Sequence, residues 1–136
     1  MDAHGEWKGG FESRLDDGRG HAVTVDLPVA EGGKDAGPDG LELTVLSLAG
    51  CIHIIFGRVA RRRKLPFTGL TVHLTAERPP QSPTITEVHG TFEVRSSAPN
   101  EDVENAFRIT MRTCPVGVLF DRAHIPVDVT LKVVPS

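Results

Sequence analysis

The stretch LELTVLSLAGCIHIIFGRVARRRK, from Leu41 to Lys64, decides the fold of this chain. Its middle carries leucine, isoleucine, valine and phenylalanine at nearly every angle around a helix, instead of along one stripe. A helix that is apolar all round lies between other elements, because each of its faces has to be covered. We therefore predict a long central helix over 41–64, which ends before Leu65-Pro66 because a residue that precedes proline disfavours helical geometry.

The residues before this helix predict two strands. Trp7, Phe11 and Leu15 recur at even spacing with charged residues between them, which indicates a strand with one buried face. A turn is predicted at 16–20, where glycines and aspartates gather, and a second strand over 23–27 completes a hairpin. A glycine-rich loop, 28–40, leads into the helix.

The residues after the helix predict three strands and two further helices. Apolar and polar residues alternate over 70–77, 87–95 and 127–133, as in half-buried strands. Asn100 is a favourable N-cap for a helix whose apolar stripe ends on Cys114. Pro115 cannot continue that helix normally, but it suits the first position of a new short one. The predicted order is ββαββααβ: an α+β fold of antiparallel sheets with a long central helix and with helices on one side, in a single domain over 1–136.

Composition limits the partners of the chain. The formal net charge is −3 and the isoelectric point is near 6.0, so we expect no nucleic-acid partner. The basic run Arg61 to Lys64 falls at the predicted helix end, where cations complement the helix dipole. The apolar segment 45–59 contains polar interruptions and is predicted to be too short and too polar for a membrane span. The acidic start, Met1 to Glu6, lacks a signal-like apolar stretch, so we expect a cytoplasmic protein without a membrane partner.

The only two cysteines, Cys51 and Cys114, are the candidate reactive groups. Two cysteines are too few for a secreted disulfide scaffold, and in a reducing compartment a pair is more often catalytic or redox-active. Cys51 in an apolar helix can equally be an inert core residue. Cys114 is predicted to be an N-cap, where the helix dipole lowers a thiol pKa. Both sulfurs are expected to point into one small core and to lie within reach of each other.

The motif around Cys51, Gly32-Gly33…Gly37-Pro38…Leu41-Glu42-Leu43…Leu46…Ala49-Gly50-Cys51, together with Cys114-Pro115-Val116-Gly117, resembles the OsmC/Ohr family. These are osmotically induced and organic hydroperoxide resistance proteins, and the resemblance extends over nearly the whole chain. It implies an intertwined homodimer with two active sites at the interface. It further implies that Cys51 is the peroxidatic and Cys114 the resolving cysteine, in a thiol peroxidase that reduces organic hydroperoxides during oxidative stress and is re-reduced by an external dithiol. Sulfenate formation followed by condensation with a second thiol is the chemistry that two such cysteines allow.

Three further residues are candidates because of this resemblance. In the hydroperoxide resistance branch a glutamate ten residues before the first cysteine works with an arginine from the N-terminal hairpin. Here that position is Leu41, while Glu42 stands nine residues before Cys51, half a turn off its face. Glu42 is thus either a catalytic residue or an acidic residue that stabilises the first turn of the helix. Because Leu41 stands where the hydroperoxide resistance branch has glutamate, the chain resembles the broader OsmC-like group more closely. Arg14 and Arg19 are the candidate cations, with Arg19 favoured because it lies in the predicted turn.

A second function remains open. The same fold could serve as a non-enzymatic dimeric module that binds a small hydrophobic ligand, with both cysteines merely buried. The leucine at position 41 favours this reading, and the cysteine pair favours the peroxidase. We expect neither a cofactor nor a metal, since Cys51, Cys114 and His53 do not have a zinc-site spacing.

Overall fold

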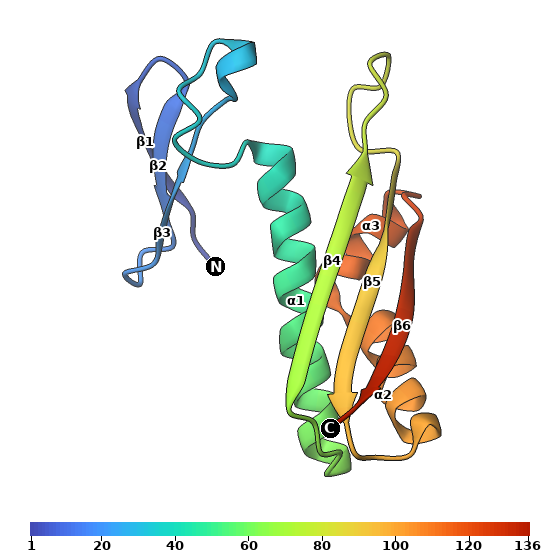
Figure 1. Ribbon diagram of the computed structural model, residues 1–136. Helices are drawn as coiled ribbons and strands as arrows, with labels where there is room; N and C mark the ends of the chain where they lie inside the picture. The colour runs from blue at the N-terminus through green and yellow to red at the C-terminus, as the bar shows by residue number, and fades with distance from the viewer. The chain divides into compact units, whose positions relative to one another are not determined.

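The computed structural model describes residues 1–136 and shows the α+β class expected from the sequence. Helices and strands follow one another as β1 (His4–Gly9), β2 (Glu12–Asp16), β3 (Ala22–Val25), a 3₁₀ turn (Val29–Glu31), α1 (Gly40–Arg63), β4 (Gly69–Glu77), β5 (Glu87–Ser96), α2 (Asn100–Thr113), α3 (Pro115–Arg122) and β6 (Val127–Pro135) (Figure 1). The chain divides into two compact units, Met1–Thr44 and Val45–Ser136, which are described separately below.

The first unit contains a sheet of order β1-β2-β3 in which neighbouring strands are antiparallel. The prediction of one strand through Trp7 and Leu15 was wrong, because the chain reverses at Gly9 and Gly10 and forms two strands. Both glycines have positive φ angles, 120° and 57°, which side chains rarely adopt and glycine adopts freely. The predicted turn at 16–20 is confirmed and joins β2 to β3.

The buried face expected for this sheet is not formed within the first unit. Trp7 is 72% exposed and Phe11 is 56% exposed. The Trp7 indole nitrogen donates a hydrogen bond to the carbonyl oxygen of Gly10 at 3.0 Å, which holds its ring at the hairpin turn. The alternation in this segment therefore correctly indicates strands, but it does not show what covers their apolar face.

A buried carboxylate organises the loop that follows β3. Asp26 accepts backbone N–H hydrogen bonds from Leu27, Lys34 and Ala36 at 2.8–3.2 Å. Burial raises the pKa of Asp26, but these donors favour the charged form and the pKa ends below its usual value. The glycine-rich segment before α1 is thus held by a side chain whose role the sequence pattern does not reveal.

The second unit contains a sheet of order β4-β5-β6. β4 and β5 are antiparallel from Gly69↔Arg95 to Glu77↔Glu87, whereas β5 and β6 are parallel from Val88↔Val127 to Ser96↔Pro135. The parallel pair departs from the antiparallel arrangement expected from the sequence. Its cause is the helical connection α2–α3, because a crossover of this length returns the chain to the end where β5 began.

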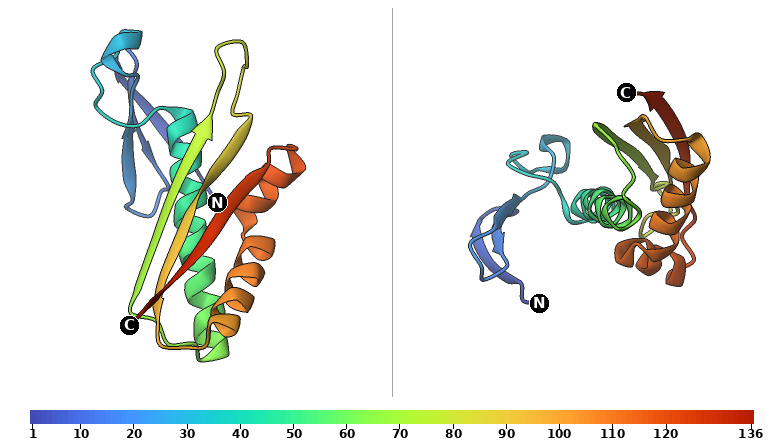
Figure 2. Two further views of the ribbon diagram at one scale, coloured as in Figure 1. Left: turned by 45° about the vertical axis from the view of Figure 1, so that its right-hand side comes forward. Right: turned by 90° about the horizontal axis from the view of Figure 1, so that it is seen from below.

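The three helices lie on one face of this sheet, as predicted and as the two views of Figure 2 show. Phe56 of α1 meets Phe92 of β5 with ring centroids 5.0 Å apart, and Phe107 of α2 meets Phe92 at 5.1 Å. The buried side chains of α1 recur every fourth residue: Leu48, Ile52, Phe56 and Ala60. α1 ends within one residue of the predicted boundary, with Lys64 in the left-handed conformation and the Leu65 N–H bonded to the Ala60 carbonyl at 2.9 Å.

α1 is more apolar than we expected for a chain without a membrane partner. Its most apolar 18-residue window has a mean hydropathy of 1.8, which suffices by length and composition to cross a membrane, and 22% of that window is buried. The prediction that this segment is too short and too polar for a membrane span was wrong by length and composition alone. Its packing on Phe92 makes it the core helix of the second unit. Its outer face remains apolar, with Leu46 58% and Ile54 64% exposed.

Candidate active site

Cys114 occupies the junction between α2 and α3, as the sequence predicts. It is the N-cap of α3, with extended backbone angles (φ −61°, ψ 114°), and Pro115 occupies the first turn. Its sulfur accepts a hydrogen bond from the Gly117 N–H at 3.4 Å, and its own N–H bonds the Thr110 carbonyl at 2.9 Å. One helix therefore ends and the next begins on the residue that carries the thiol.

The prediction that this position lowers the pKa of Cys114 was wrong. Cys114 is fully buried, and burial raises the pKa of its thiol to about 11. The Gly117 N–H pulls the pKa down, as a helix N-terminus does, but the loss of water outweighs it. The neighbouring Cys51 raises it further. At neutral pH Cys114 is therefore a protonated thiol.

Cys51 lies near Cys114, as the sequence analysis expected. Cys51 is in the middle of α1 and is partly exposed, and both cysteines are free thiols. After burial, the nearby Cys51 thiol is a further cause of the raised pKa of Cys114, which places the two thiols near each other. Two adjacent thiols, one partly exposed and one buried, are what a dithiol–disulfide couple requires.

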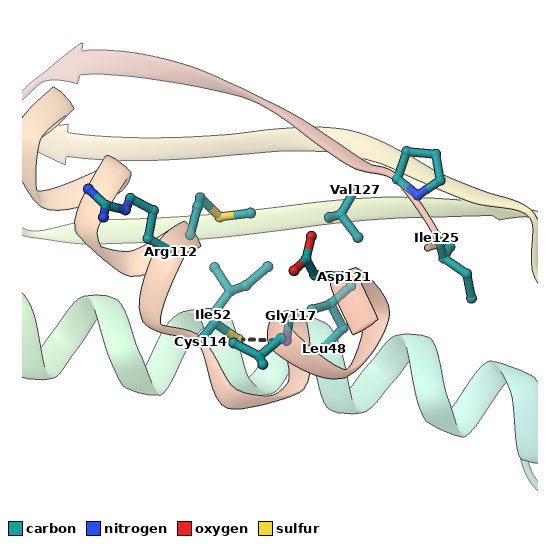
Figure 3. Close-up of a pocket in the computed structure, with 11 residues that line it drawn as sticks. Leu48, Ile52, Arg112, Cys114, Gly117, Asp121, Ile125 and Val127 are labelled. Atoms are coloured by element: carbon teal, nitrogen blue, oxygen red, sulfur yellow. Dashed lines mark hydrogen bonds between the residues drawn. The ribbon is translucent and has the colours of Figure 1, made fainter. Parts of the chain in front are cut away.

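A pocket of about 380 Å³ lies beside Cys114 within the second unit (Figure 3). α1 contributes Leu48 and Ile52, and α2 contributes Met111 and Arg112. The chain from the α2–α3 junction to the start of β6 contributes the others: Cys114, Gly117, Val118, Asp121, Ile125, Pro126 and Val127. Cys51 is not among the lining residues. In Figure 3 the Asp121 carboxylate points into the pocket, whereas the Arg112 side chain points away from Cys114.

Sequence reasoning missed this pocket. Gly117 and Asp121 follow Cys114 by three and seven residues, which places them on one face of α3. That spacing was the available sequence signal for the pocket. It indicates a pocket only when the structure shows that Cys114 caps α3 and that the start of β6 lies beside α3.

Glu42 caps the start of α1. Its carboxylate accepts from the Asp39 N–H at 2.8 Å, while the Asp39 carboxylate accepts from the Glu42 N–H at 2.8 Å. This reciprocal pair is a capping box and gives Glu42 a structural role, which was one of the two readings of the sequence. A catalytic role for Glu42 remains a prediction.

The two candidate arginines are held by aspartates of the N-terminal hairpin. Arg14 donates to Asp16 at 3.0 Å, and Arg19 lies 3.1 Å from Asp17. Both pairs belong to the first unit and both are at the surface, where such pairs stabilise a protein by about 0–1 kcal/mol. The structure thus places Cys51 and Cys114 near each other in the second unit. In the first unit, each of the two arginines forms a surface ion pair with an aspartate.

The hairpin that carries Arg19 should depend on pH through Asp17. A hydrogen bond from His21, supported by backbone N–H groups, lowers the pKa of Asp17 from 3.8 to about 2. Because the folded pKa is depressed, this stabilisation is present above pH 3.8 and is lost as the pH falls toward 2. Trp7, the single tryptophan, reports on the same sheet.

We expect Asp17→Asn to be less stable than the parent at pH 6, by a difference that shrinks between pH 4 and pH 2. The measurement is urea unfolding followed by Trp7 fluorescence at a series of pH values. A difference that stays constant across this range would show that the Asp17 carboxylate charge does not stabilise the hairpin.

Comparison with known proteins places the chain in a family. A family model described as OsmC-like protein matches residues 32–130. A search of curated proteins gave no match. Among solved structures, an OsmC-like protein from Mycoplasma pneumoniae superposes with a TM-score of 0.86 at 15% identity, covering 98% of this chain and 96% of that one.

Two hydroperoxide resistance proteins share the fold. One is the organic hydroperoxide resistance protein OsmC from Legionella pneumophila, with a TM-score of 0.72 at 16% identity and coverage of 96% of this chain and 95% of that one. The other is OhrB of Bacillus subtilis, with a TM-score of 0.68 at 15% identity and coverage of 97% and 98%. At these identities the likeness establishes the fold alone. The family match over most of the chain, together with this fold, shows that the protein belongs to the OsmC/Ohr family of OsmC-like proteins.

Proposed function

We propose that this protein is a thiol-dependent peroxidase that reduces organic hydroperoxides through Cys51 and Cys114. The observation that carries the proposal is the pair of free cysteines that lie near each other, one partly exposed and one buried. The hydroperoxide resistance proteins of the same fold support it. A cytoplasmic location is part of the proposal, since a reducing compartment keeps two free thiols available.

The reaction is a two-electron cycle. The Cys51 thiolate attacks one peroxide oxygen, the O–O bond breaks, the alcohol leaves with a proton, and Cys51 becomes a sulfenic acid. The Cys114 thiol then condenses with it, releasing water and forming the Cys51–Cys114 disulfide. An external dithiol supplies two electrons and two protons and restores both thiols.

The order of the two cysteines follows from their surroundings. A peroxidatic sulfur has to meet substrate, and Cys51 is partly exposed whereas Cys114 is fully buried. The raised pKa of Cys114 keeps it protonated and a weak first nucleophile. The N-cap position of Cys114, taken alone, would favour Cys114 as the first nucleophile, but burial outweighs the N-cap in setting the pKa of this thiol.

A cation is needed to hold the Cys51 thiolate, and we propose Arg19, with Arg14 as the alternative. Each arginine would exchange an exposed aspartate for the thiolate, an exchange that costs little because surface ion pairs are weak. Arg19 is preferred because it lies in the turn between β2 and β3. Glu42 remains a candidate through the resemblance alone, since its carboxylate already caps α1.

We also propose that the chain forms an obligate homodimer, as a single OsmC-like domain per subunit. The support is apolar surface that one chain leaves uncovered, on α1 at Leu46 and Ile54 and on the first sheet at Trp7 and Phe11. We expect sedimentation to give twice the 14.7 kDa chain mass at micromolar concentration, with more than about 2,000 Å² buried in total. A monomer at that concentration would contradict the proposal.

Substrate preference provides a test of the proposed reaction. If apolar side chains surround Cys51, burial of an apolar tail contributes about 0.8 kcal/mol per CH₂, or roughly fourfold in rate for each. We therefore expect cumene hydroperoxide to oxidise the protein much faster than hydrogen peroxide does. The measurement is the second-order rate constant for thiol loss with each peroxide, and equal rate constants would argue against an organic hydroperoxide substrate.

A further inference from the structure

A second pocket of the second unit lies where α1 ends beside the connection between β5 and α2 (Figure 1). Its walls are residues 63–66 and 97–99, together with Asp102 in the first turn of α2. Its volume of about 590 Å³ falls within the range of small-molecule sites, about 300–1,000 Å³. Cys51 stands twelve residues before the end of α1, about 18 Å along the helix axis, so this pocket is separate from the thiol pair.

The wall that comes from α1 carries cations without acidic partners. The side chains of Arg61 to Lys64 are all exposed, and none of them forms an ion pair, whereas Arg14 and Arg19 each pair with an aspartate. One cation would complement the dipole of α1, and four in succession also repel one another. Within the pocket, Arg63 and Lys64 face a single carboxylate, that of Asp102, so its walls carry a net positive charge.

Lys64 holds a backbone conformation that suits glycine better. Its φ angle is 53°, in the left-handed region, and it directly follows the last residue of α1. Glycine is the usual residue at this position, because a side chain there strains the backbone. Glycine would therefore serve the end of the helix better, whereas lysine supplies a cation to the wall of the pocket.

We propose that this pocket binds a small soluble phosphate monoester, with the phosphate held between Arg63 and Lys64. A phosphate monoester carries a charge of about −1.5 to −2 at pH 7, which these two cations match. Arginine offers a fork of N–H donors and lysine a point charge, and both groups bind phosphate oxygens. Pro66, Ala98 and Pro99 give the organic part of the ligand an apolar surface to pack on. The site goes beyond the proposed peroxidase, because it uses neither thiol.

The opposite wall acts on a bound anion in two opposing ways. No side chain caps the start of α2, so the positive end of this helix adds to the attraction of the two cations. The Asp102 carboxylate lies in the same turn and repels an anion. We therefore expect removal of this negative charge to strengthen binding.

The first test is calorimetric titration with phenyl phosphate, which should bind saturably with one molecule per chain. Arg63→Gln should weaken binding about tenfold, since a hydrogen bond to a charged group is lost. Arg62→Gln is the matched control, because it removes the same charge from the next residue along the helix, which does not line the pocket. It should weaken binding less than about twofold, because only screened attraction at a distance is lost. Absence of saturable binding, or equal weakening by both variants, overturns the proposal.

Two further variants test the sign of the effect. Asp102→Asn should tighten binding of phenyl phosphate about threefold, and weaker binding would contradict the repulsion. Lys64→Gly should weaken binding about tenfold, while the midpoint of its thermal unfolding stays the same or rises, because glycine relieves the backbone strain. Unchanged binding by Lys64→Gly overturns the role of Lys64 in the site.

A final comparison separates a soluble ligand from a lipid headgroup. Phosphatidic acid presents the same phosphate monoester at a membrane surface, so vesicles of phosphatidic acid and phosphatidylcholine are the second probe. We expect soluble phenyl phosphate to bind and the protein not to sediment with these vesicles. Sedimentation with the vesicles without saturable binding of phenyl phosphate overturns the proposal in favour of a membrane surface. None of these measurements uses peroxide, so their outcome is independent of the proposed peroxidase.

Discussion

Replacing Cys51 by serine should lower consumption of cumene hydroperoxide by about a thousandfold or more, to the background rate of the buffer. The reason is that Cys51 is the partly exposed member of the pair, while the burial that raises the pKa of Cys114 to about 11 leaves the second thiol protonated and out of reach. A serine hydroxyl has nearly the same size but is not a nucleophile toward peroxide under these conditions. The measurement is peroxide consumption in the presence of excess dithiothreitol.

Two controls make this result interpretable. Thermal unfolding of Cys51→Ser should stay close to that of the parent, since Cys51 is only partly buried. Arg58→Ala, two turns further along α1 at an exposed position, should retain activity if the effect belongs to the sulfur and not to the helix surface. Peroxide consumption by Cys51→Ser at near the parent rate would mean that Cys114 reacts first.

Replacing Cys114 by serine should reduce steady-state turnover by about a hundredfold while leaving the first oxidation of Cys51 intact. Serine is a preferred N-cap, so it can accept the Gly117 N–H in place of the sulfur and keep α3 in place. What is lost is the thiol that condenses with the sulfenic acid. Cys51 is then expected to remain as sulfenate and to proceed to sulfinate with excess peroxide.

The measurement for this variant is mass spectrometry after one equivalent of cumene hydroperoxide in the presence of a sulfenic-acid trap. The trap should label Cys51 in Cys114→Ser, and the parent should show a disulfide instead. Full steady-state turnover by Cys114→Ser, with dithiothreitol as reductant, would show that the external thiol resolves the sulfenate directly and that Cys114 is not needed.

Much of the fold could be predicted because its signals are local. The long apolar helix, the N-cap at Cys114 and the proline after it depend on neighbouring residues. α1 begins and ends close to the predicted positions, and α3 begins at the predicted proline. The hairpin at Gly9–Gly10 was missed because the apolar spacing of Trp7, Phe11 and Leu15 continues through the turn. The parallel pairing of β5 and β6 depends on which strands meet in space, which alternation along one strand does not encode.

The site was less predictable than the fold. The sequence indicated that Cys51 and Cys114 would lie close together, but it misjudged the pKa of Cys114. The N-cap contribution is local and visible in the motif, while the burial that outweighs it comes from the packing of α1, α2 and α3 around the sulfur. The pocket with Gly117 and Asp121 was invisible for the same reason, since its walls come from separate parts of the chain.

The central claim is that the two thiols form one redox couple that an organic hydroperoxide oxidises. The most direct measurement is a count of free thiols per chain before and after addition of one equivalent of cumene hydroperoxide. The proposed cycle predicts that both thiols are lost together and that both return with dithiothreitol. Two thiols that remain after treatment would contradict the peroxidase and would favour the non-enzymatic module in which both cysteines are merely buried.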